Sequence, residues 1–419
     1  MEKALLVSIQ IKTDKHHWRI EDISSELEEL AVSAGVEVAD NIICICEKAT
    51  ANYLIGKGKV EEIGLIAAEE NIDTIIFSHD LSGTQQRNLE DTLGRKTIDR
   101  TQLILDIFSR RAKSPEGKMQ VELALLEYLL PRLTGKGVML SRLGGGIGTR
   151  GPGETKLEVD RRQIRRRIDK LKTDIEAFRL HRLTTHKKRR GNNLPLVALV
   201  GYTSAGKSTL LNRLTDAGQT TSEKLFTTLD PLSKNLKLPN GQDIIISDTV
   251  GFLHELPHHL IEAFKATLEE VSDADLLIHV LDVSDQRIHQ HNQAVQSVLD
   301  ELGLKDKPIL AALNKMDLIA DRSWLEVYKN EFKDSVILSA KSGENVDALI
   351  ESIQRYFSGL MLNLKIIIPH SRMELVDFFY RQAKVDKIDY LQEGIRISLR
   401  ISRELFSKIS KDRDIKVIC

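Results

Sequence analysis

The sequence predicts an α/β fold with a mainly parallel sheet, because short apolar runs alternate with amphipathic helical patterns along most of the chain. The clearest unit starts with the apolar run Leu194 to Val200, which is typical of a buried strand. It continues through the glycine-rich Gly201-Tyr-Thr-Ser-Ala-Gly-Lys-Ser208 into the helical pattern of residues 209–214. A strand, a glycine loop and a helix start, in this order, form the context that a phosphate-binding loop requires.

Length and composition set the limits of the interpretation. At 419 residues the chain exceeds the roughly 250–300 residues at which one core stops growing, so we expect about three domains. Hydrophobic content of 41% and charged content of 29% are typical of a soluble protein. The first apolar run is too short for a signal peptide, and no run approaches the ~20 apolar residues of a membrane span. We therefore expect a cytoplasmic monomer, and peripheral association with a membrane stays open.

Residues 1–112 are expected to form a small α/β domain. The expected strands are 4–11, 36–46 and 74–77, and the expected helices are 21–32, 60–68, 85–93 and 101–112. Gly56-Lys-Gly58 precedes one of these helices and could bind an anion, but we favour a structural turn. Cys44 and Cys46 lie in an apolar pattern without a second ligand pair, so we interpret them as buried residues rather than a metal site.

Residues 113–190 predict a helical hairpin with a glycine-rich, basic tip. Helical patterns cover residues 118–133 and 154–183, and the second carries a heptad seam at Ile164, Ile168, Leu171, Ile175 and Phe178. A long connecting loop rich in glycine and arginine suits an irregular phosphate surface such as RNA, which we favour over a solvated helix face and a flexible linker. The candidate RNA contacts are Lys136, Arg142, Arg150, Lys156, Arg161, Arg162, Arg165 and Arg166.

Residues 191–358 continue the α/β pattern around the phosphate loop. The expected strands are 235–238, 243–247, 276–283, 309–313 and 336–338, the first two joined by a Pro-Asn-Gly hairpin turn, and a helix over 346–357 closes the domain. Residues 359–419 predict a small C-terminal α+β domain with a helix at 373–382, a strand at 395–401 and a final apolar run at 415–418.

Three further motifs each follow an expected strand: Asp248-Thr-Val-Gly251, Asn314-Lys-Met-Asp317 and Ser339-Ala-Lys341. Asp248 can hold Mg²⁺ through water, and the N–H of Gly251 can reach a γ-phosphate. Asp317 can accept hydrogen bonds from N1–H and the 2-amino group of guanine. Adenine offers neither donor and would leave a buried carboxylate unsatisfied. The motifs therefore predict a P-loop GTPase domain that binds GTP and GDP and hydrolyses GTP.

The expected Mg²⁺ ligands are Ser208, Thr228 and Asp248. Thr228 lies in Leu225 to Pro231, a segment expected to close on the γ-phosphate, and Thr227 is the alternative. The residues predicted to contact the nucleotide are Gly201, Tyr202, Thr203, Ser204, Ala205, Gly206, Lys207, Ser208, Phe226, Thr227, Thr228, Leu229, Asp230, Asp248, Thr249, Val250, Gly251, Asn314, Lys315, Met316, Asp317, Ser339, Ala340 and Lys341.

The sequence assigns no side chain firmly to catalysis. Lys207, Thr228 and Gly251 are expected to support the γ-phosphate, but Phe252 occupies the position at which many GTPases place the glutamine that orients water. A phenyl ring cannot orient water, so we predict slow intrinsic hydrolysis that a partner raises by roughly 10³–10⁵. The nearby histidines, His254, His258 and His259, lack acidic or cysteine partners at ligand spacing, and we interpret them as surface residues rather than metal ligands.

The arrangement resembles the translation-factor class of GTPases, and the chain is similar to the HflX family of ribosome-associated GTPases. The residues that carry this resemblance are 144–155, 157–162, 201–209 and 225–231, and it covers residues 1 to about 360 well and the tail loosely. The resemblance implies a hairpin that binds the large ribosomal subunit near its catalytic centre, and GTP-dependent splitting of ribosomes, particularly under stress. It also implies ATP hydrolysis by the N-terminal part.

Ser204 departs from the family pattern, which has an asparagine that in some relatives helps to hold potassium. This difference argues against a potassium-dependent mechanism. Two other functions stay open. One is a regulatory GTP switch acting on a protein partner, and the other is an ATP-dependent RNA remodeller that the GTPase domain regulates.

Overall fold

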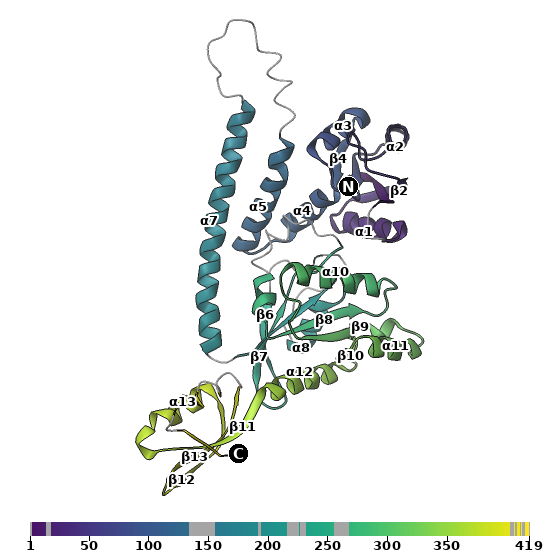
Figure 1. Cartoon of the computed structure of the whole chain (residues 1–419). Coiled ribbons are helices and arrows are strands. Elements are labelled where there is room, and N and C mark those ends of the chain that lie inside the picture. Colours follow the sequence, from purple (N-terminus) through teal and green to yellow (C-terminus); the bar gives the residue numbers. More distant parts are fainter. Residues whose placement is uncertain are drawn as a thin grey trace.

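The structure is a computed structural model, and it describes residues 2–13, 18–133, 156–191, 194–215, 226, 232–254, 268–402, 406, 409–410, 412 and 415–418. Within these residues the strands form three sheets, of four, six and four strands. Figure 1 shows the N-terminal and C-terminal sheets at opposite ends of the molecule, with the largest sheet between them and a long helix alongside. The α/β class predicted from the sequence is confirmed.

The N-terminal sheet is parallel, with strand order β2-β1-β3-β4. Helices α1 and α4 cover one face through Leu30 and Ile104, and helices α2 and α3 cover the other through Ile63 and Leu89. The sequence did not predict β4, a four-residue strand that follows directly on α3. The elements are β1 (Lys3–Ile11), α1 (Ile20–Ser33), β2 (Glu37–Cys46), α2 (Lys57–Glu69), β3 (Thr74–Phe77), α3 (Gly83–Leu93), β4 (Lys96–Asp99) and α4 (Arg100–Arg111).

The hairpin consists of α5 (Pro115–Arg132) and α7 (Lys156–Gly191), which pack along each other. Leu123 of α5 meets Ile168 and Leu171 of α7 in a buried seam. The predicted seam was too long, because Phe178 is 41% exposed. The helix also continues past its predicted end at residue 183, since a polar helix can be solvated on all sides. None of the helices in the described ranges has the length and apolarity needed to cross a membrane.

The central sheet has strand order β10-β9-β8-β5-β7-β6 and is parallel except for the β6–β7 hairpin, which the Pro-Asn-Gly turn had predicted. The carboxyl ends of its parallel strands therefore meet at one edge, where ligands of open α/β sheets bind. The elements are β5 (Leu196–Gly201), α8 (Lys207–Thr215), β6 (Leu232–Lys237), β7 (Asp243–Asp248), β8 (Leu276–Asp282), α10 (Ile288–Glu301), β9 (Ile309–Asn314), η1 (Met316–Leu318), α11 (Ser323–Glu331), β10 (Ser335–Ile337) and α12 (Val346–Leu360).

The C-terminal sheet is antiparallel, with strand order β12-β13-β11-β14, and α13 covers it through Phe379. Strands β11 and β12 were not predicted: β11 follows α12 without a connecting loop, and in β12 lysines and aspartates interrupt the apolar pattern. The elements are β11 (Met361–Ile368), η2 (His370–Arg372), α13 (Glu374–Gln382), β12 (Lys384–Leu391), β13 (Gly394–Ser402) and β14 (Lys416–Ile418).

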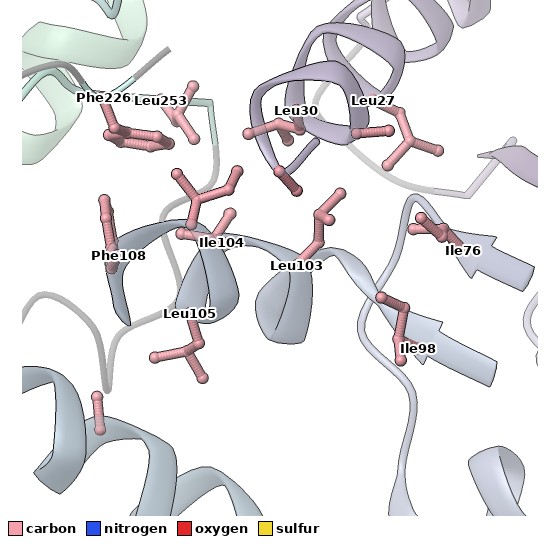
Figure 2. Packing of buried hydrophobic residues seen from close by; sticks show 14 of the residues in the cluster. Leu27, Leu30, Ile76, Ile98, Leu103, Ile104, Leu105, Phe108, Phe226 and Leu253 are labelled. Carbon is pink, nitrogen blue, oxygen red and sulfur yellow. The ribbon is translucent and has the colours of Figure 1, made fainter. Parts of the chain in front are cut away.

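The N-terminal domain and the central domain share one hydrophobic cluster. Figure 2 shows Phe226 and Leu253 of the central domain approaching Ile104 and Phe108 of α4, close to Leu30 of α1. The rings of Phe108 and Phe226 meet edge to face, with centroids 4.5 Å apart. The N-terminal domain is therefore packed directly against Phe226 and against the end of the segment that follows Asp248.

Candidate nucleotide site

The phosphate loop turns at two glycines that admit no side chain. Gly201 ends β5 with φ +156°, and a Cβ there would collide with the carbonyl oxygen of Val280. Gly206 has φ +99°, and a Cβ there would collide with the side-chain amide of Asn314. The loop can therefore follow this tight path into α8 only with glycine at both positions.

Lys207 is buried at the start of α8, and its ammonium is fixed by the loop itself. Nζ donates hydrogen bonds to the carbonyl oxygens of Gly201, at 3.0 Å, and Tyr202, at 2.8 Å. Burial lowers the pKa of Lys207 to about 8, although the nearby carboxylate of Asp248 raises it. A buried cation at a helix N-terminus is stabilised by an anionic ligand, as phosphate would be.

Ser208 and Asp248 form the candidate metal site. The hydroxyl of Ser208 donates to Oδ2 of Asp248 at 2.7 Å, and both residues are buried. The hydroxyl of Thr249 donates to the carbonyl oxygen of Leu199 at 2.6 Å and so fixes the end of β7 against β5. A donor set of hydroxyl and carboxylate oxygens fits Mg²⁺, which prefers hard oxygen ligands. The third predicted Mg²⁺ ligand, Thr228, lies outside the described residues. The same holds for its predicted neighbours Thr227, Leu229 and Asp230.

Asn314 connects the phosphate loop with the predicted base-binding loops. Its side-chain amide donates to the carbonyl oxygen of Ala205 at 2.8 Å, and its Oδ1 accepts the N–H of Ala340 at 2.9 Å. Arg213 of α8 donates to the carbonyl oxygen of Ala340 at 3.2 Å and supports the same loop. The motifs that begin at residues 201, 314 and 339 are therefore held together by direct hydrogen bonds at one sheet edge.

The base end of the site is more open than the phosphate end. Asp317 lies in η1 with its side chain exposed, whereas Met316 and Ser339 are buried. Lys315 adopts a left-handed φ of +67°, and its Nζ pairs with Asp282 at 2.6 Å. Asp317 is therefore free to meet a planar ring that enters beside Lys315.

A cavity of about 170 Å³ lies beside the loop, and part of its wall comes from the N-terminal domain. Tyr202, Ser204, Asp282 and Lys315 line it from the central domain, and Glu26 and Glu29 line it from α1. Asp282 was not predicted from the sequence, although its position at the carboxyl end of β8 is a usable signal. Glu26 and Glu29 had no such signal, because they come from a distant helix.

Phe252 does not face the phosphate loop. Its ring is 1% exposed and packs in a core with Val200, Leu268 and Val295. The backbone of Phe252 lies on the loop instead. Its N–H donates to the carbonyl oxygen of Gly201 at 3.1 Å, and its carbonyl oxygen accepts the N–H of Thr203 at 2.9 Å. No side chain that could orient water is therefore supplied at position 252.

Gly251 packs directly on the phosphate loop. A Cβ at this position would lie 2.9 Å from Cα of Thr203 and 3.1 Å from Nζ of Lys207. Gly251 and Lys207 therefore lie close together, and a side chain at position 251 would collide with the phosphate loop.

The side chain of Tyr202 points away from the predicted ligand and into the N-terminal domain. Its hydroxyl donates to Glu26 and accepts the N–H of His254 at 3.0 Å. Burial and the neighbouring carboxylate of Glu26 raise the pKa of Tyr202 well above its usual value, so the phenol stays protonated. Its ring stacks on His291, with centroids 3.8 Å apart. The carbonyl oxygen of Tyr202, in contrast, faces the phosphate-binding side, where it accepts a hydrogen bond from Lys207.

The remaining predicted sites are only partly within the described residues. Lys136, Arg142 and Arg150 lie outside them, as does the side chain of Lys156. On α7, Arg162, Arg165 and Arg166 are exposed and Arg161 is half-buried.

The histidines and cysteines show no metal site among the described residues. His254 is half-buried and stacks on Trp18, with ring centroids 4.2 Å apart, while His258 and His259 lie outside the described ranges. Cys44 is buried, and burial raises the pKa of its thiol to about 11, which makes it unreactive.

Family models match the chain in four consecutive segments. They are described as GTP-binding GTPase N-terminal (residues 21–109), GTP-binding GTPase Middle Region (111–189), 50S ribosome-binding GTPase (196–315) and HflX C-terminal domain (326–414).

Curated relatives match over nearly the whole chain. GTPase HflX of Caldanaerobacter subterraneus subsp. tengcongensis is 44% identical over 408 residues, which are 97% of this chain and 93% of the relative. GTPase HflX of Escherichia coli K12 is 38% identical over 401 residues, 96% of this chain and 93% of the relative. Among solved structures, a GTP-binding protein of Sulfolobus solfataricus in complex with GDP matches with TM-score 0.44 and 25% identity, over 85% of this chain and 98% of that one.

Proposed function

This chain belongs to the HflX family of GTPases, and from that membership we propose that it is a GTP hydrolase that binds the large ribosomal subunit. We propose that it splits or rescues ribosomes, particularly under stress. GTP binding would drive association with the ribosome, and hydrolysis would drive release. A cytoplasmic location and a monomeric state belong to the same proposal.

One observation carries the proposal: Asn314 holds the phosphate loop and the base-binding loops at a single sheet edge. Lys207 marks the phosphate end of that edge and Asp317 the base end. An exposed carboxylate at Asp317 matches the two donors of guanine, so the nucleotide is GTP rather than ATP. An adenine beside Asp317 would bring the N1 acceptor and the C2–H, neither of them a hydrogen-bond donor to the carboxylate, against Asp317.

The chain's own residues would act mainly by positioning. Ser208, Asp248 and Thr228 would hold Mg²⁺, which when bound neutralises charge on the phosphate oxygens. Lys207, fixed by two carbonyl oxygens, would hold the terminal phosphates, and the N–H of Gly251 would meet the γ-phosphate once its peptide leaves the loop. Because Phe252 is buried in the core, hydrolysis by the protein alone is expected to be slow, and the ribosome is expected to stimulate it.

The hairpin is proposed to grip ribosomal RNA. Exposed Arg162, Arg165 and Arg166 on α7 support this role, together with the basic, glycine-rich sequence of residues 134–155. Phosphate contacts made by guanidinium groups release counterions, so the affinity should fall steeply as salt rises.

Sedimentation with ribosomes tests the proposal. The full-length chain is incubated with ribosomes and either GDP or a non-hydrolysable GTP analogue, at increasing salt. We expect co-sedimentation with the analogue, weaker co-sedimentation with GDP, and a lower affinity for the Arg142→Gln, Arg150→Gln variant. Absence of binding in the analogue, with intact GTP binding, would instead favour a switch that acts on a protein partner.

A secondary ATPase in the N-terminal domain is the weaker part of the proposal. Lys57 and Lys59, beside Gly56 and Gly58, pair with glutamates of their own helix, Lys57 with Glu61 at 3.7 Å and Lys59 with Glu62 at 2.7 Å. These pairs favour a structural turn. ATP turnover that survives Lys207→Ala but is lost when both lysines are replaced by glutamine would support the second activity.

A further inference from the structure

Side chains of the N-terminal half hold the central domain at two places, at His254 before residues 255–267 and at Glu269 after them. We call these two sets of contacts the two anchors. The first anchor is Arg100 with Glu26, acting on Tyr202 and His254. The second anchor is Arg179 with Arg182, acting on Glu269. The two residues that are held, His254 and Glu269, both follow the Gly251–Phe252 peptide that packs on the phosphate loop.

The first anchor holds the peptide groups of His254 from two sides. Arg100, the first residue of α4, donates to the carbonyl oxygen of His254 at 2.6 Å and also pairs with Glu26. Glu26 accepts the hydroxyl of Tyr202, which in turn accepts the N–H of His254 at 3.0 Å. The side chains of Arg100 and Glu26 are only 11% and 6% exposed, so this charged network is shielded from water and is stronger than a surface pair.

The second anchor holds the helical segment 268–273 against the hairpin. Arg179 of α7 donates to Glu269 at 2.7 Å, and Arg182 donates to the other carboxylate oxygen at 3.1 Å. Arg182 also pairs with Glu116 of α5 at 3.1 Å. One carboxylate of the central domain is therefore connected to both helices of the hairpin.

The first anchor is also connected by hydrogen bonds to the end of α5, where the sequence of the hairpin tip begins. Asp99, which precedes Arg100, caps α4 by accepting the N–H of Gln102 at 2.8 Å. The same carboxylate accepts Arg132 and the hydroxyl of Tyr128, both at 2.9 Å, from the last turns of α5. A displacement at the end of α5, next to the glycine-rich loop, would therefore act on the N-terminus of α4 and on Arg100.

These contacts would oppose a movement of the backbone of residues 251–254 away from the phosphate loop. The γ-phosphate is proposed to meet the N–H of Gly251 beside Lys207, where the hydrogen bonds of Phe252 to Gly201 and Thr203 hold this backbone on the loop. His254 follows shortly after Phe252 and is held in place by the first anchor. Movement of the backbone away from the loop thus has to strain or break that anchor.

From this geometry we infer that Arg100, and the pair Arg179 and Arg182, are positioning residues for the GTPase site. They hold residues 249–254 and 268–273 in an arrangement in which Gly251 packs against Thr203 and Lys207, and they connect the release of this arrangement to the orientation of the hairpin. The inference rests on the proposed function and adds the residues through which hairpin and nucleotide are coupled. Because coupling is reciprocal, a ligand that moves the hairpin should change the affinity for GTP.

The test compares full-length variants in nucleotide affinity without ribosomes. Arg100→Gln removes the first anchor and Arg179→Gln, Arg182→Gln the second. Arg167→Gln is the matched control, because Arg167 makes an ion pair of the same kind with Glu122 inside the hairpin, at 2.6 Å. The dissociation constants for GDP and for a non-hydrolysable GTP analogue are measured with Mg²⁺ by equilibrium titration.

We expect Arg100→Gln to tighten binding of the GTP analogue about fivefold while GDP changes less than about twofold, in the range of ordinary coupling energies. The double variant should shift in the same direction by less, and Arg167→Gln should shift neither constant. Arg100→Lys keeps the charge but loses the planar fork and should give an intermediate value. Glu269→Gln breaks the second anchor from the other side and should match the double variant.

Equal shifts for GDP and the analogue, or shifts in Arg167→Gln as large as in Arg100→Gln, would overturn the inference, because they indicate general loosening. If Arg100→Gln fails to fold, Tyr202→Phe opens the same network with the ring packing kept, and it should also favour the analogue over GDP. A wild-type chain that binds neither nucleotide would instead refute the proposed function.

Discussion

The phosphate loop has two faces, and they differ in what surrounds them. On one face Lys207 and Ser208 lie at the carboxyl edge of the central sheet, where Ser208 donates to Asp248 of β7 and Asn314 of β9 binds the loop at Ala205. On the other face the side chain of Tyr202 enters a network with Glu26 and contacts the aromatic rings of the N-terminal interface. A single loop can therefore bind phosphate on one side and sense the position of another domain on the other. Substitutions on the two faces should separate these roles.

The largest effect is expected from Lys207→Ala, which removes the cation of the nucleotide face. Its ammonium is buried and held by two carbonyl oxygens, so it needs no reorganisation when phosphate binds. We expect kcat/KM for GTP, measured with ribosomes, to fall by about 10³-fold. Lys305→Ala, at an exposed surface pair, is the control and should keep wild-type turnover. A loss of less than about tenfold in Lys207→Ala would contradict the assignment of this face.

A smaller effect is expected at the base end, from Asp317→Ala. Removing a carboxylate that accepts two donors of guanine should weaken GTP about 100-fold and leave ATP nearly unchanged, so that the preference for GTP is lost. Competition binding with GTP, GDP and ATP measures the three affinities. If GTP and ATP weaken together, Asp317 supports the loop and does not select the base.

The nucleotide face was predictable from sequence because its signals are local. Gly201 to Ser208 carries the turn, the cation and the hydroxyl within one strand–loop–helix unit, and Asp248 and Asn314 each follow a short apolar strand. Local order along the chain becomes spatial proximity in a parallel sheet, since the carboxyl ends of its strands meet at one edge.

The other face could not be predicted, since its partners come from distant parts of the chain. Glu26, Arg100 and His254 meet only after two domains pack together, and a lone acidic or basic residue on an amphipathic helix indicates a solvated surface. The missed strands have a similar cause. In β12, charged residues mask the alternation, and pairing with β13 rather than its own composition makes it a strand.

His279, in the central sheet below the phosphate loop, should make the stability of the protein depend on pH. It is buried in β8, and burial, with a smaller effect from the charge of Lys207, lowers its pKa to about 3. The unfolded chain takes up a proton as pH falls through about 6.5, whereas the folded chain does not until near pH 3, so stability falls with pH across that window. His279 alone should account for a loss of about 1.6 kcal/mol between pH 6.5 and pH 5.

Urea unfolding at both pH values checks this expectation against the His279→Leu variant, which should lose that much less stability on acidification. His291, whose pKa burial lowers to about 4, remains in the variant and keeps part of the slope. Equal slopes in the two proteins would mean that the folded chain also protonates His279.

The smallest effect in free energy is expected from Tyr202→Phe, and it distinguishes the two faces most directly. The substitution keeps the ring on His291 and the carbonyl oxygen that holds Lys207, but it removes the hydroxyl between Glu26 and His254. Because one buried acceptor and one N–H lose a partner, the free energy of unfolding should fall by about 1 kcal/mol. GTP should still bind, since every contact on the nucleotide face remains. Urea unfolding with and without GTP measures both. If Tyr202→Phe lost nucleotide binding, as Lys207→Ala should, the two faces would act as one site. If Tyr202→Phe lost no stability, the hydroxyl would not connect the domains.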